Sequence, residues 1–308
     1  MRVRAPGKVN LWLAVGPLRR DGFHDIATVF HAVSLADDVT ASEGTPGSGI
    51  GVRTDGEGAD AVPSGPENLA YRAVQLLAGR LGQPADIDLL IAKSIPVAGG
   101  MAGGSADAAA ALLAVSELWH QPVDLASLSA VAAQLGSDVP FALVGGTAVG
   151  TGRGEQLAPV LARGEFHWVL ALAHTSLSTP QVYAELDRLR EASGRESPAP
   201  EIPAQLMAAL REGDAREVGR HLGNDLQEAA ISLRPELAVV LESGLDLGAL
   251  GGIVSGSGPT CAFLATDREH ALDLAAGLTS VPRVRSVRYA TGPAAGARVV
   301  RDDVVRGS

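Results

Sequence analysis

The sequence predicts an α+β fold built in two parts. Three observations support this: β-rich runs open the chain, a glycine-rich loop joins a strand to an alanine-rich helix near residue 100, and strands alternate with helices again after residue 165. We place the boundary so that residues 1–158 form the N-terminal domain and residues 159–308 the C-terminal domain.

The first third of the chain is predicted to hold strands and one helix. Residues 9–15 alternate in side-chain character, residues 26–35 form a second β-rich run, and residues 19–22 form a turn between them. Leucine and alanine recur at helical spacing over residues 68–81, and residues 86–93 are predicted to form a strand.

The rest of the chain continues the mixed pattern. After the glycine-rich loop we expect a helix over residues 106–119, and Asp124 is a suitable N-cap for another helix that ends at Gly136. Residues 138–151 are apolar and predicted to be a strand. The later elements are a strand over 168–174, helices over 204–222 and 235–244, strands within 252–264, a helix over 269–278 and a strand over 283–290.

The composition indicates a globular chain and argues against nucleic-acid binding. Hydrophobic residues make up 46% and charged residues 19%, which leaves ample apolar material for a core. The net charge is −10, whereas non-specific binding to nucleic acid depends on Lys and Arg. The single cysteine, Cys261, excludes an intramolecular disulfide. With neither a targeting signal nor a membrane span visible, we expect a cytoplasmic location. We expect the protein to be a monomer or a homodimer.

A glycine-rich loop over residues 96–105 carries the strongest chemical signal. Four of its six central residues are glycine, and the loop runs into a predicted helix. Backbone N–H groups at a helix N-terminus attract anions, and glycine lets the backbone approach a phosphate closely. A tight connection without a ligand does not require so many glycines. Neither the Walker pattern nor the dinucleotide fingerprint fits this loop. The sequence therefore predicts a phosphate-binding loop of another type.

Three stretches together resemble the motifs of the GHMP small-molecule kinases, the family of galactokinase, homoserine kinase and mevalonate kinase. The glycine-rich loop is similar to their phosphate loop, residues 5–10 (Ala-Pro-Gly-Lys-Val-Asn) to their N-terminal motif, and residues 254–261 (Val-Ser-Gly-Ser-Gly-Pro-Thr-Cys) to their C-terminal glycine motif. The resemblance implies a GHMP kinase fold, with a half like ribosomal protein S5, a ferredoxin-like second half and a cleft between them.

Two further stretches are similar to one branch of that family. Residues 20–24 (Arg-Asp-Gly-Phe-His) and 135–141 (Leu-Gly-Ser-Asp-Val-Pro-Phe) resemble the kinases of the non-mevalonate isoprenoid pathway. The resemblance implies ATP as the phosphoryl donor, Mg²⁺ as its counter-ion and 4-diphosphocytidyl-2-C-methyl-D-erythritol as the acceptor, which is phosphorylated on its 2-hydroxyl group.

The resemblance places the catalytic pair on Lys8 and Asp138. These residue types suit the reaction, because a carboxylate can accept the proton of an attacking hydroxyl and an ammonium can stabilise charge on the transferred phosphoryl group. Taken alone, Lys8 could be a solvated lysine at a strand end and Asp138 a turn or cap residue. Only the fold can bring them together.

The predicted acceptor contacts also follow from the resemblance. Phe23 would stack on the cytosine and His24 would hydrogen-bond to its edge, although the family more often has tyrosine at the first position. Asn10 and Thr179 would contact the rest of the acceptor together with Asp138.

For ATP, the resemblance implies contacts along the phosphate loop and near the adenine. Asn68 would lie near the base, and it is also a suitable helix N-cap. Ser105 is the hydroxyl at the helix start, so it would contact a phosphate or Mg²⁺. The predicted ATP-binding residues are Asn68, Pro96, Val97, Ala98, Gly99, Gly100, Met101, Ala102, Gly103, Gly104, Ser105 and Ala106.

Two other functions stay open at this point. Another GHMP kinase, acting on homoserine, mevalonate or a sugar, would share the loop and the catalytic pair but would not need residues 21–24. A non-catalytic nucleotide-binding protein would keep the fold without needing Lys8 and Asp138.

Overall fold

A computed structural model describes residues 1–121, 123–194 and 197–301, so residues 302–308 of the predicted C-terminal domain lie outside it. The strands are β1 (Arg2–Leu18), β2 (His24–Glu43), β3 (Ile50–Gly56), β4 (Ile87–Lys93), β5 (Thr147–Thr151), β6 (Gln156–Pro159), β7 (Phe166–Ala173), β8 (Gly223–Asn224), β9 (Gly251–Val254), β10 (Cys261–Ala265), β11 (Val284–Gly292) and β12 (Arg298–Val299). The helices are η1 (Ala59–Ala61), α1 (Leu69–Leu81), α2 (Gly103–Leu118), α3 (Leu125–Leu135), α4 (Val139–Val144), α5 (Thr179–Ser193), α6 (Ala204–Glu212), α7 (Ala215–Arg220), α8 (Leu226–Leu233), α9 (Glu236–Asp246) and α10 (Arg268–Thr279).

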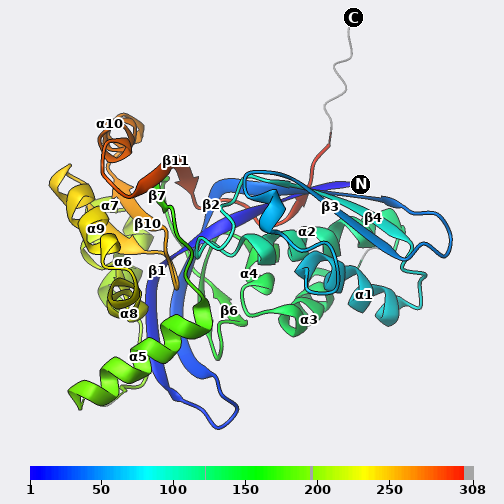
Figure 1. Cartoon of the computed structure of the whole chain (residues 1–308), viewed down its shortest axis with the longest axis horizontal. Helices are drawn as coiled ribbons and strands as arrows, with labels where there is room; N and C mark the ends of the chain where they lie inside the picture. Colours follow the sequence, from blue (N-terminus) through cyan, green and yellow to red (C-terminus); the bar gives the residue numbers. More distant parts are fainter. Residues whose placement is uncertain (122, 195–196, 302–308) are drawn as a thin grey trace, which may run out of the picture.

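The described strands form two sheets, which confirms the predicted α+β class. The first has the strand order β12–β1–β2–β4–β3, with β5 and β6 joined through β2 and with β8 beside β1. The second has the order β11–β7–β10–β9. Figure 1 shows the first sheet next to α1–α4 and the second next to the later helices. Because β8 and β12 pair with β1, the division after residue 158 stays a prediction.

The long hairpin of β1 and β2 runs through both parts of the molecule, in blue in Figure 1. The register shifts between Pro6 and Gly7 and again between Asn10 and Trp12. Such bulges bend a strand and change the direction of its side chains. Lys8 and Asn10 lie between the two bulges and two residues apart, so their side chains leave the same face of β1.

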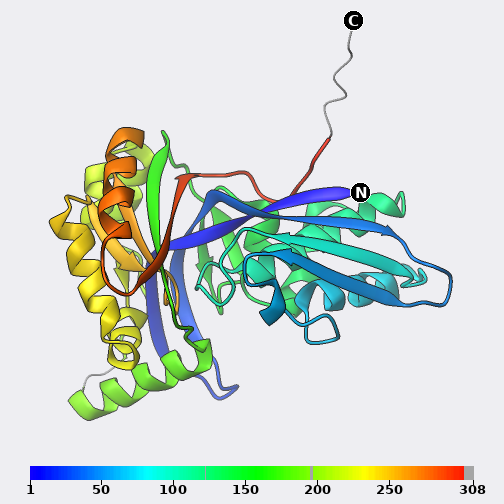
Figure 2. The same ribbon diagram turned by 45° about the horizontal axis from the view of Figure 1, so that its top comes forward.

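Helix α2 is the centre of the first part. It contacts β1, β2, α1, α3 and α4, and Figure 2 shows these helices gathered along one side of the strands. Alanine allows the close approach that such a position needs, because its side chain ends at Cβ. The fully buried alanines of this helix are Ala106, Ala108, Ala109, Ala110, Ala111 and Ala114.

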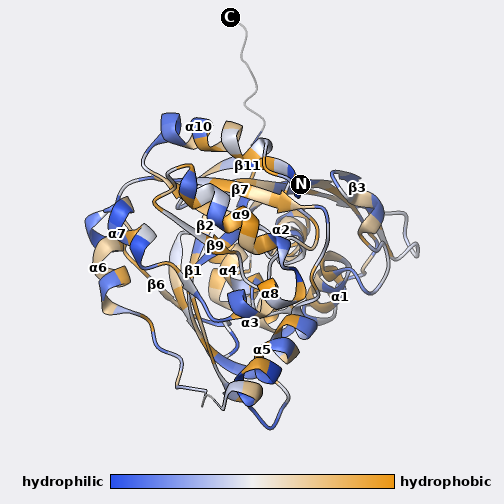
Figure 3. Ribbon diagram, turned by 60° about the vertical axis from the view of Figure 1, so that its left-hand side comes forward, coloured by the Kyte–Doolittle hydropathy of each residue, from blue (hydrophilic) through white to orange (hydrophobic). Residues whose placement is uncertain are grey.

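The second sheet is buried on both faces. In β7, Trp168 and Leu170 belong to the core that the sheet shares with the hairpin, whereas Val169 and Ala171 belong to the core beneath α8, α9 and α10. Alternate residues of a strand point to opposite faces, so a strand covered on both sides is uniformly apolar. Figure 3 shows β7 in orange and bluer helices at the surface.

The structure corrects three sequence-based expectations. The strand expected over residues 138–151 is wrong in its first half, which forms α4, because Pro140 fits the first turn of a helix and Gly145 ends it with φ 66°. The helix expected over 204–222 is two helices, separated where Gly213 has φ 76° and Asp214 caps α7. Helix α2 begins at Gly103, three residues earlier than expected, while α5 and α8 were not predicted at all.

Within the described ranges, no helix combines the length and the apolar character needed to cross a membrane.

The different burial of two tryptophans predicts that replacing them will lower the free energy of unfolding by different amounts. Trp168 is 0% exposed, whereas Trp119 at the end of α2 is only partly buried. Trp168→Ala should lower the free energy of unfolding by about 3–5 kcal/mol, because it leaves a large cavity, and Trp119→Ala should lower it by clearly less. Urea denaturation followed by circular dichroism measures both. Equal losses would contradict the position of Trp168 in the shared core.

Candidate active site

A cavity of about 840 Å³ lies where the two parts meet. Both the hairpin and the segment after β7 contribute to its wall. Met101 and Ala106 were predicted to bind ATP, but both are fully buried in the core and their side chains do not line the cavity. The other predicted residues do line it: Lys8, Asn10, Phe23, His24, Asn68, Pro96, Val97, Ala98, Gly99, Gly100, Ala102, Gly103, Gly104, Ser105, Asp138 and Thr179.

The glycine-rich loop presents the N-terminus of α2 to this cavity. Ala102 is the N-cap residue, and its side chain makes no capping hydrogen bond. The first N–H groups of a helix have no partner within the helix, so this end can bind an anion through the backbone. Ser105 lies in the first turn of α2, not at the N-cap, and it lines the cavity.

The loop packs directly on the C-terminal glycine motif. A Cβ on Gly100 would lie 2.2 Å from the carbonyl oxygen of Ser255, so only glycine fits at this contact. The carbonyl oxygen of Gly100 accepts hydrogen bonds from Ser255 Oγ at 3.2 Å and from Lys8 Nζ at 3.1 Å. Ser257 and Thr179 share a hydrogen bond of 2.8 Å. The motif therefore supports the loop as well as forming part of the cavity wall.

The structure brings Lys8 and Asp138 together, as the sequence predicts. Their Nζ and Oδ2 atoms are 3.7 Å apart, and Lys8 Nζ also donates to Asn10 Oδ1 at 2.7 Å. The Lys8 side chain is 7% exposed and that of Asp138 is 32% exposed. Burial lowers the pKa of Lys8, and the Asp138 carboxylate opposes this effect. Asp138 reaches the cavity because it immediately precedes α4.

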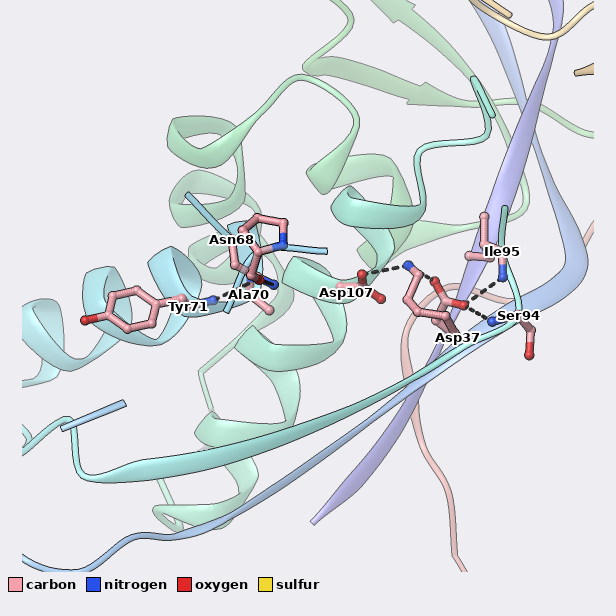
Figure 4. Close-up of polar contacts among 9 residues, drawn as sticks. Asp37, Asn68, Ala70, Tyr71, Ser94, Ile95 and Asp107 are labelled. Carbon is pink, nitrogen blue, oxygen red and sulfur yellow. Dashed lines mark hydrogen bonds and ion pairs between the residues drawn. The ribbon is translucent and has the colours of Figure 1, made fainter. Parts of the chain in front are cut away.

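Asn68 is the N-cap of α1, which confirms its structural role. Its Oδ1 accepts from the N–H groups of Ala70 at 2.7 Å and Tyr71 at 3.3 Å, as Figure 4 shows. Its Nδ2 donates to the carbonyl oxygen of Pro63 at 2.7 Å. An amide nitrogen has two hydrogens, so one remains for a ligand in the cavity.

The predicted cytosine contacts line the same cavity, next to residues that the sequence did not reveal. His24 Nε2 is 3.0 Å from Asp187 Oδ1, and the ring of His24 is tilted against Tyr183 with centroids 5.2 Å apart. The Phe23 side chain is half exposed and lies 5.0 Å from the guanidinium of Arg153.

Beneath the phosphate loop lies a second charged group that the sequence did not reveal. Lys93 Nζ lies 2.5 Å from Asp37 Oδ2 and 2.7 Å from Asp107 Oδ2, and all three side chains are almost fully buried. Burial raises the pKa of Asp107 to about 7, against the effect of Lys93. Burial alone would lower the pKa of Lys93, but the Asp107 and Asp37 carboxylates outweigh it and raise that pKa. Two carboxylates and one ammonium therefore share this buried site.

Similar proteins reveal the family. The GHMP kinases N terminal domain matches residues 68–146, and the GHMP kinases C terminal domain matches residues 206–283. A 4-diphosphocytidyl-2-C-methyl-D-erythritol kinase of Mycolicibacterium smegmatis is 56% identical over 298 residues, covering 97% of this chain and 92% of the relative. Its counterpart from Nocardia farcinica is also 56% identical, covering 97% and 95%.

Solved structures agree with this grouping. A crystal structure of 4-(cytidine 5′-diphospho)-2C-methyl-D-erythritol kinase has a TM-score of 0.76 and 35% identity, covering 94% of this chain and 98% of that one. A homoserine kinase from Cytophaga hutchinsonii shares the fold at a TM-score of 0.73 and 20% identity, covering 97% of each chain. The chain belongs to the GHMP kinase family and, within it, to the branch of the 4-diphosphocytidyl-2-C-methyl-D-erythritol kinases.

Proposed function

We propose that the chain transfers the γ-phosphoryl group of ATP to the 2-hydroxyl of 4-diphosphocytidyl-2-C-methyl-D-erythritol. The observation that carries this proposal is the arrangement of one cavity. The Lys8–Asp138 pair contacts the phosphate loop through the carbonyl oxygen of Gly100, and it lines the same cavity as the residues expected to hold cytosine. A donor held at the loop and an acceptor held at His24 would therefore meet at the pair. The cytoplasmic location and the monomeric or homodimeric state stay predictions.

Asp138 and Lys8 would carry the chemistry. The acceptor oxygen forms a bond to the γ-phosphorus while the bond between that phosphorus and the β,γ-bridging oxygen breaks, which releases ADP. The proton of the acceptor hydroxyl goes to the Asp138 carboxylate. Lys8, held by Asn10 and the carbonyl oxygen of Gly100, keeps an ammonium beside the transferred group. Such a direct transfer needs no covalent enzyme intermediate.

Mg²⁺ is the expected counter-ion of ATP. The described residues contain no group of three or more His, Cys, Asp or Glu side chains that could hold a metal ion by themselves. These surroundings fit an ion that arrives on the nucleotide, since Mg²⁺ keeps several waters and takes oxygen ligands from phosphates. Ser105 would supply the protein oxygen. When bound, the ion neutralises charge that develops on the phosphates.

His24 would recognise cytosine through one tautomer. A carboxylate only accepts hydrogen bonds, so the contact with Asp187 places the proton of the neutral ring on Nε2. Nδ1 is then an acceptor, which suits the 4-amino group of cytosine and disfavours the 4-carbonyl of uracil. Asp187 would thus set base preference through the tautomer of His24.

The choice of acceptor is the most direct test of the function. Purified protein with ATP and Mg²⁺ is given 4-diphosphocytidyl-2-C-methyl-D-erythritol, mevalonate, homoserine or galactose, and ADP release is followed. We expect release with the cytidine compound alone. Release with another acceptor would contradict the cytosine assignment and keep the kinase, whereas binding of ATP without release for any acceptor would favour a non-catalytic protein.

Replacing the proposed base separates chemistry from binding. Asp138→Asn should lower kcat by ~10²-fold or more, because the amide cannot accept the hydroxyl proton. ATP affinity, measured by calorimetry, should stay within about twofold. The matched control is Asp273→Asn on the exposed face of α10, which should leave kcat unchanged. An Asp138→Asn enzyme with normal turnover would remove the base assignment.

The tautomer assignment predicts a change in specificity at Asp187. Asp187→Ala should raise KM for the cytidine substrate by about fivefold, the equivalent of one hydrogen bond, with KM for ATP unchanged. The same variant should lose part of its preference for the cytidine substrate over the 4-diphosphouridyl analogue. Steady-state kinetics with both acceptors measure this, and an undiminished preference in Asp187→Ala would refute the role of the carboxylate.

A further inference from the structure

Asp37 is buried next to the phosphate loop without reaching the cavity. It lies on β2, it is 0% exposed, and the cavity wall does not include it. Its neighbour Asp38 is 13% exposed and pairs with Arg2 and Arg4, whose side chains reach the surface. Two adjacent aspartates on one strand thus have different surroundings, and a fully buried carboxylate must be compensated by specific partners.

Both oxygens of Asp37 are committed to the start of the loop. Oδ1 accepts from the backbone N–H groups of Ser94 at 2.6 Å and Ile95 at 2.8 Å, as Figure 4 shows. Oδ2 accepts from Lys93 Nζ at 2.5 Å. Three donors from consecutive residues therefore converge on one carboxylate. This fixes the direction in which the chain leaves β4.

The same group of contacts reaches the other end of the loop. Lys93 Nζ also donates to Asp107 Oδ2 at 2.7 Å, and Asp107 lies in the second turn of α2. A Cβ on Gly103 would lie 3.2 Å from Lys93 Nζ, so the ammonium packs directly against the first residue of α2. The bridge from Asp37 through Lys93 to Asp107 spans the loop from its entry to its exit.

The loop needs such outside support because its backbone is strained. Ala98 and Ala102 have φ values of 55° and 59°, in the left-handed region that favours glycine. Residues in such conformations persist only when contacts around them hold the backbone in place. A buried carboxylate–ammonium bridge is a weak source of overall stability but a strong constraint on geometry, since breaking it leaves a charge unpaired.

We propose that Asp37 is a positioning residue for ATP, which acts through Ser94, Ile95 and the Lys93–Asp107 bridge to hold the phosphate loop and the first turn of α2 in their anion-binding shape. This rests on the proposed ATP-dependent function. Because Asp37 does not line the cavity, its carboxylate would contact neither nucleotide nor acceptor. Its loss should therefore weaken nucleotide binding while the acceptor site stays intact.

The test compares Asp37→Ala and Asp37→Asn with the matched control Asp38→Asn. The Kd of the non-hydrolysable ATP analogue AMP-PNP with Mg²⁺ is measured by calorimetry, below the temperature at which each variant begins to unfold. Asp37→Ala removes all three acceptor contacts and should raise this Kd at least tenfold. Asp37→Asn keeps an oxygen for the two N–H groups but removes one of the two carboxylate partners of Lys93, so a rise of about threefold is expected. Asp38→Asn should stay within about twofold.

Kinetics and stability separate positioning from a purely structural role. KM for ATP should rise in step with Kd, while KM for the cytidine acceptor stays within about twofold. A lower Tm with unchanged nucleotide Kd in the folded variants would overturn the proposal. If Asp37→Ala does not fold, Asp37→Asn decides alone, and an unchanged Kd there would overturn it as well. Absence of AMP-PNP binding by the unmodified protein would instead refute the proposed function.

Discussion

The phosphate loop between β4 and α2 has a strained backbone, so contacts from other parts of the structure must hold its conformation. From one side, Ser255 and Lys8 donate to the carbonyl oxygen of Gly100. From below, Asp37 holds the N–H groups at the loop entry. A helix N-terminus binds an anion tightly only if its free N–H groups already point toward the anion site before binding. Ordering these groups during binding would lower the affinity. These contacts supply that preorganisation.

The long hairpin of β1 and β2 links the conformation of the phosphate loop to both parts of the molecule. β1 contributes Lys8 and β2 contributes Asp37, so the two strands reach the loop from different directions. The second sheet packs against the same hairpin through Trp168. The glycine motif after β9 packs closely on Gly100, and the packing of the second sheet against the hairpin sets the position of this motif. A change deep in the second core can therefore alter the phosphate site without touching it.

Local sequence patterns predicted the parts of the site that lie within one motif. The glycine-rich loop and the cap at Asn68 each belong to one short stretch, and Lys8 and Asp138 each belong to a short motif that the resemblance identifies. The other residues of the site are brought together only by tertiary packing, so no local pattern predicted them. Tyr183 and Asp187 follow the predicted contact Thr179 at four-residue spacing on one face of α5, but this helix is too polar for its apolar pattern to stand out. Asp37 and Asp38 are adjacent aspartates in one strand. No local feature of the sequence indicates that Asp37 is the fully buried one of the two.

The electrostatics of the cavity explain why backbone geometry matters so much here. The chain has a net charge of −10, and both proposed substrates carry phosphates. The cations along the described cavity wall are Lys8, Lys93 and Arg153, and the first two already face carboxylates. Little side-chain charge is left for the triphosphate, so its negative charge would be met by N–H groups at the start of α2 and by the Mg²⁺ proposed to accompany ATP. N–H groups act through direction as well as charge, and their contribution falls when the loop relaxes. In this acidic kinase, few cationic side chains of the cavity are free to bind phosphates. Nucleotide binding therefore depends on buried residues whose role is to fix the backbone of the phosphate loop.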